Sequence, residues 1–546
     1  MSVTIRTEQT PPATTAGDRP PTRREIGRRE VGLWTLGSAA LSTAVTLALP
    51  HLGIGNDSYQ YLGVADNLLT GAGVTTDIPF FDVETAHGVV PSPITTHPPG
   101  YPVAIAAARL LGLPPVAAAV AVSVLAAALT VLVLGLACRR LGVPRWAARV
   151  AVAGFMLNPF TLVHAGSVLS ESLFTLLVTS AVLGMVVAER TGARTASVLA
   201  GVALGLSVHV RYAGLFVVVG AAVGLTLLLL LARRDRRSAL ALALTVGTAL
   251  PLFAPLLVRN QLVAGTWRGG NDVDVDHPVL ELLAKTAWTG VHLVVGDASG
   301  PLARVPQALL AVAVLAALVL LVRRRPDLRD GALVLLAAAV VVYAALMFEA
   351  GLVSVISYGP RMFLPVLPAA LLLLALAASR VRDARPVASR AAVRAGAAVV
   401  AVAALAVGVL GAFAKADAPP HVGVAERLAA PLAGGGTTAE WLDAHLAPGE
   451  PVVAADGQAT GYALQEPVVG LVESTFSDTR WDEETVAALM DRSGARYLLL
   501  YRHPQDGGGA LVEQESPFLG ILLAGRPAET LRPVASSAEV LVLERR

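Results

Sequence analysis

The sequence GNDSYQYLGVADNLLTG at residues 55–71, followed by TTHPPGYP at residues 95–102, forms a polar interruption between long apolar runs. Asp57 comes close behind the first of these runs. An ionisable side chain at such a position is tolerated only at the wet interface of a membrane or inside a protein cavity. We therefore expect this stretch to form an active site at a membrane surface.

The composition around this stretch is that of a multi-span membrane protein. Of the 546 residues, 55% are hydrophobic and only 15% are charged, and the mean hydropathy is +0.64. The single cysteine, Cys138, excludes an internal disulfide and a thiolate metal cluster. The sequence contains no P-loop, no G-x-G-x-x-G motif after a strand and no G-x-S-x-G motif. ATP hydrolysis, dinucleotide redox chemistry and serine-hydrolase chemistry are therefore disfavoured.

Apolar segments long enough to cross a bilayer recur along the chain. A span needs about 20 residues, and on that measure we count about eleven. They lie at about 33–51, 114–137, 147–166, 168–188, 195–210, 212–232, 238–258, 304–322, 331–350, 361–379 and 391–413. We therefore predict a mainly α-helical, polytopic membrane architecture at residues 31–413. Residues 1–30, rich in Pro, Thr and Arg, are predicted to form a disordered cytoplasmic tail.

Arginine in the short loops predicts the orientation of these spans. With the amino terminus inside, every predicted inner loop carries arginine, as the positive-inside rule requires. These loops are 139–149, 189–194, 233–237, 323–330 and 379–394. The same orientation places loops 52–113 and 259–303 and all residues after 414 outside. We expect a multi-pass cell-membrane protein with a cytoplasmic amino terminus and an extracytoplasmic carboxyl-terminal domain.

The carboxyl-terminal region changes character after a predicted linker at 414–436. Short apolar runs such as PVVGL at 467–471 and RYLLLY at 496–501 have the pattern of strands, whereas WDEETVAALMDRSG at 481–494 has the pattern of a helix. Asp482 and Gly494 are suitable amino- and carboxyl-terminal caps for that helix. We predict a small external α/β domain at residues 437–546.

The opening stretch itself predicts two helices joined by a loop. Asp57 has two interpretations: a solvated acid that caps a helix beginning near Ser58, or a functional carboxylate. The apolar stripe within 59–69 is consistent with a helix that lies on the membrane and ends at Gly71. The prolines of HPPGYP predict a rigid extended turn before a second interfacial helix.

Three arginines lie on the predicted outer side, against the positive-inside pattern. They are Arg211, Arg259 and Arg361. Each alone could extend its side chain to the interface at little cost. A shared phosphate site explains all three together, because guanidinium groups match phosphate oxygens.

Two further residues keep alternative interpretations. Glu171 is either an acid favoured at the amino terminus of a span or a contact to acceptor, sugar or a bound cation. His97 could bind phosphate or a metal ion, or serve only as a hydrogen-bonding loop residue. A structural zinc site is disfavoured, because no His/Cys cluster has ligand spacing.

The order of these motifs resembles the GT-C class of polytopic membrane glycosyltransferases. The similarity is greatest to protein O-mannosyltransferases and lipid A aminoarabinose transferases, which are glycosyltransferase family 39-like. After Asp57 and HPPGYP come SVLSESLF around Glu171, VHVRYAGL around Arg211, LVRNQLVAGTW around Arg259 and YGPRMFLPVLP around Arg361. The resemblance covers most of residues 33–380.

The resemblance implies transfer of a sugar from a polyprenyl-phosphate donor to a protein, lipid or cell-wall glycan acceptor on the outer face. Asp57 matches the catalytic carboxylate of the class and would act as general base. Asp77, Asp82 and Glu84 are candidates for a second acid, with Glu171 as a further acceptor contact. Arg211, Arg259, Arg361 and His97 would surround the donor phosphate. Dependence on a divalent cation stays undecided, and the expected partners are donor, acceptor and membrane lipids, without nucleic acid.

Two other classes of function stay open. Many apolar spans with arginines would also suit a secondary transporter or a flippase for the lipid carrier, although transporters tend to show repeats and midplane sites. The third possibility is a non-catalytic scaffold of the cell envelope, whose external domain binds a polymer or a partner protein.

Overall fold

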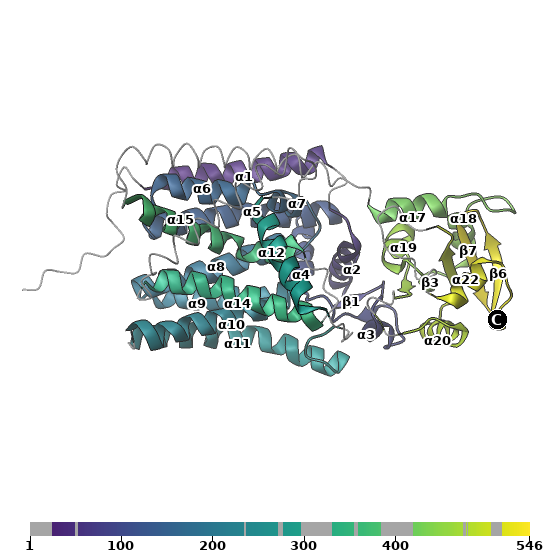
Figure 1. Ribbon diagram of the computed structural model, residues 1–546. Helices are drawn as coiled ribbons and strands as arrows, with labels where there is room; N and C mark the ends of the chain where they lie inside the picture. The colour runs from purple at the N-terminus through teal and green to yellow at the C-terminus, as the bar shows by residue number, and fades with distance from the viewer. Residues whose placement is uncertain are drawn as a thin grey trace, which may run out of the picture.

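The chain folds into a helical bundle followed by an α/β unit, with the polar opening stretch lying between them (Figure 1). The computed structural model describes residues 25–49, 53–233, 236–270, 277–295, 330–353, 359–383, 419–472, 477, 479–503 and 516–546.

Five described helices of the bundle are long and apolar enough to cross a membrane. They are α1 (Arg28–Ala48), α5 (Pro115–Arg140), α8 (Glu171–Thr191), α11 (Arg236–Ala264) and α14 (Gly331–Val353). Helices α6 (Arg145–Met156) and α7 (Pro159–Ala165) form a pair bent by 51° that passes the same test together. The bend has a local cause, because the Asn158 side chain accepts the backbone N–H groups of Phe160 and Thr161 and caps a new helix that starts with proline.

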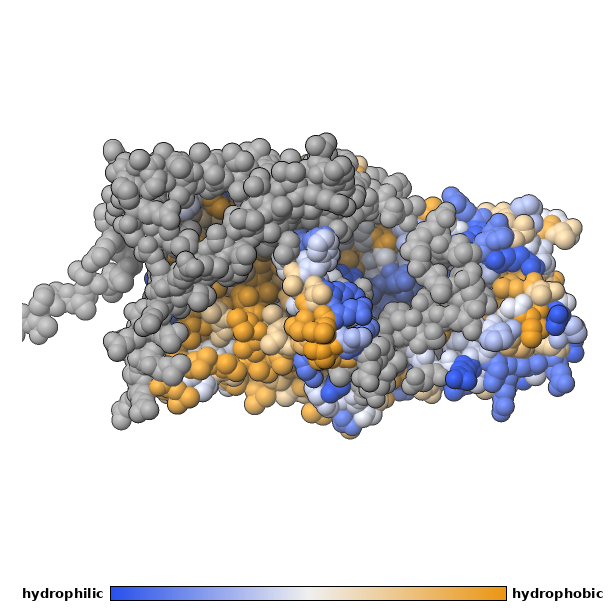
Figure 2. Space-filling model, in the orientation of Figure 1, coloured by the Kyte–Doolittle hydropathy of each residue, from blue (hydrophilic) through white to orange (hydrophobic). Residues whose placement is uncertain are grey.

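Shorter apolar helices complete the bundle. They are α9 (Arg194–Val210), α10 (Gly214–Leu227) continued by η1 (Leu228–Arg233), and η2 (Pro360–Val366) continued by α15 (Leu367–Asp383). Each predicted span on described residues coincides with a helix or a pair of helices, whereas the predicted spans 304–322 and 391–413 lie outside the described residues. Apolar side chains dominate the visible surface over α10, α11 and α14, and hydrophilic residues gather on the α/β unit (Figure 2).

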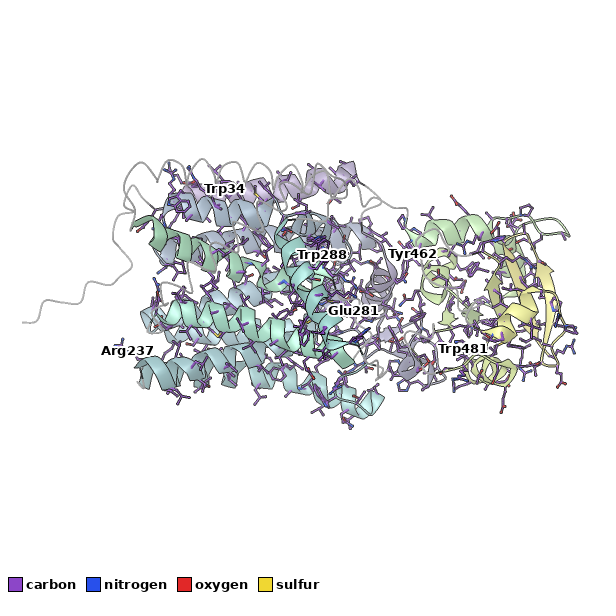
Figure 3. The ribbon with its side chains drawn as sticks, in the orientation of Figure 1. Trp34, Arg237, Glu281, Trp288, Tyr462 and Trp481 are labelled. Carbon is purple, nitrogen blue, oxygen red and sulfur yellow. The ribbon has the colours of Figure 1, made fainter. Side chains whose placement is uncertain are left out.

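Helix α12 (Val279–Val295) was not predicted, since its 17 residues fall inside the expected outer loop 259–303. It buries Leu282 and Leu293 but leaves Leu280 81% and Trp288 63% exposed. Figure 3 shows Trp288 and Glu281 on this helix. It is shorter than the roughly 20 residues used to recognise a span and is therefore missed by that criterion.

The predicted boundary of the disordered tail at residue 30 is wrong. Helix α1 begins at Arg28, and Ile26 is fully buried. Glu30 accepts hydrogen bonds from Arg145 at 2.8 Å and Arg149 at 2.6 Å, so opposite charges from the start of helix α6 hold the first turn of α1.

Described residues from four of the five loops predicted to be cytoplasmic contact one another in pairs. Arg190 donates to the carbonyl of Leu141 at 3.4 Å and lies 3.8 Å from the carboxylate of Asp330. The side chain of Arg237 approaches Gly192, and Figure 3 shows Arg237 at the end of the bundle away from the α/β unit.

Helix α2 (Asn56–Thr70) is buried within the protein, and the expectation of a helix lying on the membrane is therefore wrong. Tyr59 and Leu62 are 1% and 3% exposed. Tyr59 contacts Tyr462 and His421 of the α/β unit, so the apolar stripe packs against protein. Gly71 ends the helix in the left-handed conformation, with φ +86°, as predicted.

The two prolines of HPPGYP lead directly into α4 (Gly100–Arg109). Pro102 lies in its first turn, where a missing N–H costs no helical hydrogen bond. A side chain at Gly100 would meet the carbonyl oxygen of His209 at 2.6 Å, so α4 packs closely against the end of α9.

The α/β unit contains a five-stranded sheet in the order β4-β3-β5-β7-β6. Its strands are β3 (Val452–Ala454), β4 (Val468–Gly470), β5 (Tyr497–Tyr501), β6 (Leu531–Ser536) and β7 (Val540–Arg545). Strands β3, β4 and β5 are parallel, whereas β7 pairs antiparallel with both β5 and β6. The helices are α17 (Pro420–Leu428), α18 (Thr438–His445), α19 (Gly457–Leu464), α20 (Glu483–Ser493) and α22 (Pro517–Leu523).

Two details of this unit bear on the predictions. Asp482 accepts the N–H of Thr485 at 2.8 Å and Gly494 is left-handed, so both predicted caps of α20 are confirmed. Helix α17 lies inside the predicted linker 414–436, which is an error. Val424 and Leu428 of α17 are buried in one of the cores of the unit, so this segment belongs to the α/β fold.

The segment between α2 and α4 joins the bundle to the sheet. It contains the short strands β1 (Thr75–Thr76) and β2 (Ser92–Pro93) and the helix α3 (Asp82–Thr85). The carbonyls of Asp77 and Pro79 accept hydrogen bonds from Val468 at 3.0 Å and Gly470 at 2.9 Å. Residues 77–79 therefore lie along β4, at the edge of the sheet.

Candidate active site

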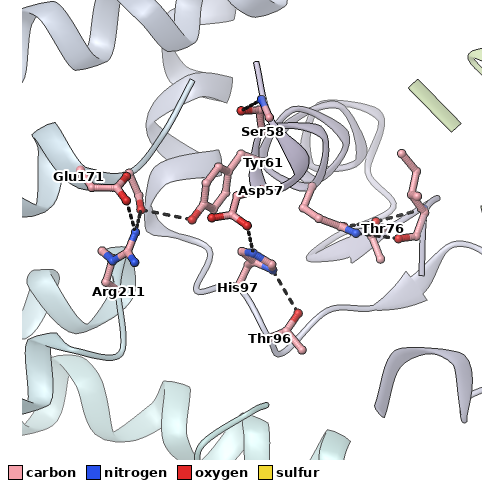
Figure 4. A network of polar contacts seen from close by, with 12 residues as sticks. Asp57, Ser58, Tyr61, Thr76, Thr96, His97, Glu171 and Arg211 are labelled. Carbon is pink, nitrogen blue, oxygen red and sulfur yellow. Dashed lines mark hydrogen bonds and ion pairs between the residues drawn. The ribbon is translucent and has the colours of Figure 1, made fainter. Parts of the chain in front are cut away.

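Asp57 lies in the first turn of α2. Gly55 is the N-cap, and its N–H donates to the hydroxyl of Ser58 at 3.0 Å. The Asp57 side chain is 33% exposed, and its Oδ1 is 3.8 Å from Nε2 of His97 (Figure 4). Its Oδ2 is 3.9 Å from a terminal nitrogen of Arg361. A helix amino terminus favours a carboxylate at this position.

The surroundings of Asp57 keep it ionised. Burial raises the pKa of its carboxyl, but the contact with His97 and the charges of Arg361 and Arg211 outweigh burial and hold the pKa well below its usual range. The resting site therefore presents an anion beside the guanidinium groups of two arginines. Such a carboxylate can accept a proton once part of that positive charge is shared with another anion.

His97 connects this carboxylate to a second one. Its Nδ1 is 3.2 Å from the hydroxyl of Thr96, and Thr96 also makes a short hydrogen bond to Oε1 of Glu84 (Figure 4 draws the contact of His97 with Thr96). Glu84 is fully buried, and its Oε2 accepts the N–H groups of Phe80 at 2.9 Å and Phe81 at 3.2 Å. Burial raises the pKa of the Glu84 carboxyl above its usual range, against the effect of these hydrogen bonds.

The other predicted acids of this loop point elsewhere. Oδ2 of Asp82 accepts the hydroxyl of Ser477 at 2.5 Å and so faces the α/β unit. Asp77 is partly buried, and burial raises the pKa of its carboxyl although a hydrogen bond from Asn67 opposes the change. Of the three candidates, Glu84 is the one that hydrogen bonds link to His97.

A buried ion pair lies on the other side of Asp57. Oε1 of Glu171 is 3.0 Å from Nη1 of Arg211, and the same nitrogen donates to Ser170 at 3.0 Å. The Ser170 hydroxyl is also 3.2 Å from that of Tyr61 (Figure 4). Glu171 is 1% exposed, and its Oε2 has no hydrogen-bond partner among the described residues. Arg211 therefore pairs with Glu171, and its charge also acts on Asp57.

Arg259 lies apart from this group. Its two terminal nitrogens donate to the carbonyls of Ile94 at 2.9 Å and Val74 at 3.1 Å. The hydroxyl of Tyr212 donates to the carbonyl of Thr95. These contacts fix the backbone just before Thr96 and His97. Arg259 stabilises the conformation of the loop, and no contact among the described residues joins it to Asp57.

The structure thus brings Asp57, His97, Arg361 and the Glu171–Arg211 pair together. Residues that the sequence reasoning missed are Tyr61, Thr96, Ser170 and Met362, the last of which lies 3.6 Å from Nη2 of Arg211. Two signals were present in the sequence. Tyr61 is four residues after Asp57 and so shares its helix face, and Thr96 directly precedes the HPPGYP motif. Among the described residues, no group of three or more His, Cys, Asp or Glu side chains could hold a metal ion.

Comparisons with known proteins agree with this architecture. Residues 104–258 match the family model described as dolichyl-phosphate-mannose-protein mannosyltransferase. No curated protein matches the chain by sequence. Among solved structures, ArnT from Cupriavidus metallidurans bound to undecaprenyl phosphate is similar at 15% identity and a TM-score of 0.58, over 95% of this chain and 98% of that one.

Two further structures have a similar fold. An oligosaccharyltransferase from Archaeoglobus fulgidus, in complex with zinc and sulfate, matches at 14% identity and a TM-score of 0.55, over 86% of this chain and 68% of that one. The arabinofuranosyltransferase AftD from Mycobacteria matches at 18% identity and a TM-score of 0.53, over 95% of this chain but only 40% of that one. The chain is a multi-pass membrane protein with the GT-C fold, and the predicted resemblance to that class is confirmed.

Proposed function

We propose that this protein is a membrane glycosyltransferase that transfers a sugar from a polyprenyl-phosphate donor to a hydroxyl group of an acceptor on the extracytoplasmic face. The observation that carries the proposal is the arrangement around Asp57. A partly exposed carboxylate lies within 4 Å of two potential cations, His97 at 3.8 Å and Arg361 at 3.9 Å, and feels the charge of Arg211. A base beside a set of cations suits attack by a hydroxyl and departure of a phosphate.

In the proposed reaction, Asp57 accepts the proton of the acceptor hydroxyl while the oxygen attacks the anomeric carbon of the sugar. The bond between that carbon and the phosphate oxygen breaks, and the polyprenyl phosphate leaves with the electron pair. The guanidinium groups of Arg361 and Arg211 stabilise the charge that develops on the phosphate. The products are the glycosylated acceptor and the free lipid phosphate.

Donor binding would also adjust the base. In the resting site, the cations lower the pKa of Asp57, which makes it a weak proton acceptor. A phosphate that binds the same cations would reduce their effect on Asp57 and so raise the pKa of its carboxyl. Asp57 would therefore become an effective base when the donor is in place.

The similar ArnT structure contains undecaprenyl phosphate, which supports a lipid phosphate as the donor class here. The outer-face location is supported by the separation of the arginine-bearing loops from the site. Arg190, Leu141 and Asp330 meet at one end of the bundle, whereas α2 lies against the α/β unit. Nucleotide sugars are made in the cytoplasm, so a site on the outer side would need a lipid-linked donor.

The test uses purified full-length protein in proteoliposomes with an envelope extract as acceptor. The probes are undecaprenyl-phosphate mannose and undecaprenyl-phosphate arabinofuranose, each labelled in the sugar. We expect transfer of label from one of them, and Asp57→Asn should lower its rate by about 10²- to 10⁴-fold. The control is Asp66→Asn, which changes the same group on the same helix in an ion pair with Arg109 away from the site.

Transfer that survives Asp57→Asn at the wild-type rate would contradict the catalytic role. Movement of the unlabelled lipid carrier across the bilayer without sugar transfer would instead favour the flippase.

A further inference from the structure

Four side chains form a continuous line from the reaction centre into the protein. They are Asp57 on α2, His97 and Thr96 after β2, and Glu84 on α3. The separations are 3.8 Å from Asp57 to His97 and 3.2 Å from His97 to Thr96, and a short hydrogen bond completes the line to Glu84. Transfer of a sugar requires only Asp57 and the cations, so the inner half of the line is not explained by the reaction itself.

The hydroxyl of Thr96 gives this line a direction. A threonine hydroxyl has one proton to donate and lone pairs with which to accept. When that proton goes to the carboxylate of Glu84, the hydroxyl must accept a hydrogen from Nδ1 of His97. Nε2 of His97 then faces Asp57 and can take a proton from it. A single proton shift along the line reverses both hydrogen bonds of Thr96.

Glu84 is suited to be the end of such a line. Its Oε2 already accepts two backbone N–H groups, so Oε1, which faces Thr96, is the oxygen left to carry a proton. Full burial disfavours its charged form, which agrees with the raised pKa of this carboxyl.

Charged and titratable side chains of the described residues lie on the elements around Glu84. Asp82 on its own helix is bound to Ser477, and Arg492 at the end of α20 lies against Gly88. His97 is linked to Glu84 through Thr96.

We propose that Glu84 is the store for the proton that Asp57 removes from the acceptor, an inference that rests on the proposed function of Asp57. The proton on Asp57 passes to Nε2 of His97, the Nδ1 proton passes to the oxygen of Thr96, and the Thr96 proton passes to Oε1 of Glu84. Asp57 ends as a carboxylate, His97 as a neutral ring protonated on Nε2, and Glu84 as a carboxylic acid. No other bond forms or breaks in this step.

This relay removes the proton from the centre while product and lipid phosphate are still present. A protonated Asp57 would leave the acceptor proton free to return to the new glycosidic oxygen. With the proton on Glu84, Asp57 is again an anion beside His97 and Arg361. After the products leave, the line runs in reverse, and the partly exposed Asp57 releases the proton to water.

The first test needs no substrate. In infrared titration of the full-length protein in nanodiscs, Glu84 should be ionised at the working pH, and its protonated carbonyl band should appear on acidification while the pH is still above the ordinary carboxyl range of about 4. Glu84→Gln should abolish this band and Asp57→Asn should keep it. A Glu84 that stays ionised down to that range would overturn the proposal, whatever the activity of the enzyme.

The second test interrupts the path of proton transfer at Thr96 and leaves Glu84 unchanged. Thr96→Val removes the hydroxyl and should lower kcat by at least about tenfold with KM for the donor unchanged, and Thr96→Ser should restore it. The donor is the undecaprenyl-phosphate sugar that the wild type turns over. The solvent deuterium isotope effect on kcat should increase in Thr96→Val, because removal of the proton becomes limiting.

Ser92→Ala is the matched control, since the Ser92 hydroxyl donates to the backbone carbonyl of Glu84 at 2.8 Å and takes no part in the line. Equal losses in Ser92→Ala and Thr96→Val would show that loop integrity alone is measured and would overturn the relay. A wild-type rate in Thr96→Val would also overturn the relay, while loss of transfer in Asp57→Asn would leave the proposed function standing.

Discussion

The Glu171–Arg211 pair should contribute to folding as well as to the site, and Glu171→Gln measures that contribution. The carboxylate is 1% exposed and holds Arg211 at 3.0 Å, while the guanidinium is 18% exposed. Both partners are therefore largely out of water, where an unpaired charge is costly. The substitution keeps the shape of the side chain but removes the charge that neutralises Arg211.

The expected magnitude follows from this burial. Breaking a buried ion pair by removing one partner costs about 3–5 kcal/mol. The amide oxygen of the glutamine still accepts one hydrogen bond from Arg211, so we expect the lower end, about 3 kcal/mol. In the double variant with Arg211→Gln no charge is left unpaired, and the loss should be smaller than the sum of the two single losses by about 2 kcal/mol.

The assay is unfolding of the full-length protein by SDS in mixed micelles, followed by tryptophan fluorescence. The control is Arg149→Gln, which breaks a 2.6 Å ion pair with Glu30 in which the arginine is 49% exposed. An exposed pair of this kind contributes about 0–1 kcal/mol. If Glu171→Gln shifts the free energy of unfolding no more than Arg149→Gln does, or if the double variant is fully additive, Glu171 and Arg211 are not paired in the folded protein and the reasoning is refuted.

Three other predictions concern the loop and its neighbours. Arg259→Gln removes both hydrogen bonds to loop carbonyls and should slow sugar transfer by about 100-fold, because His97 is then misplaced. The affinity for undecaprenyl phosphate, measured by isothermal titration calorimetry, should change by less than about threefold. A large loss of affinity would instead support the predicted contact of Arg259 with phosphate. Gly470→Ala should lower the midpoint of thermal unfolding, since the new carbon would lie 2.6 Å from the ring of Phe80, whereas Gly423→Ala, which meets nothing within 4 Å, should not. Because the pKa of Glu84 is raised on folding, its protonation favours the folded state at low pH, and that stability is lost as the pH rises through the folded pKa. The wild type should therefore lose stability relative to Glu84→Gln as the pH rises above the ordinary carboxyl range of about 4, and a constant difference would contradict the shift.

Most of the bundle could be predicted from the sequence, because the signal for a span is local. A run of apolar residues must be a helix in lipid, whatever it packs against. Helix α12 was missed because it is shorter than a span and partly polar, and α17 was missed because its 9 residues are too few for a clear helical pattern. Helix α17 packs Val424 and Leu428 into the α/β unit, and that tertiary contact is not visible in the segment alone.

The candidate site divides in the same way. Asp57, His97 and Arg361 were predicted because each stands in a recognisable motif or breaks the charge rule. The link from His97 through Thr96 to Glu84 forms because the loop between residues 84 and 97 brings its two ends together. No residue spacing in the sequence predicts this contact. The charge rule also cannot distinguish an arginine that binds phosphate from one such as Arg259 whose donors meet backbone carbonyls.

The hydrogen bonds from Val468 and Gly470 to the segment 77–79 have a practical consequence for anyone who produces the α/β unit alone. Removing residues before 419 would strip β4 of this cover and leave the N–H groups of an apolar edge strand open to other chains. We expect the isolated unit to self-associate. A fusion that restores the missing strand, with residues 75–82 attached through a flexible linker, is the form that should remain monomeric.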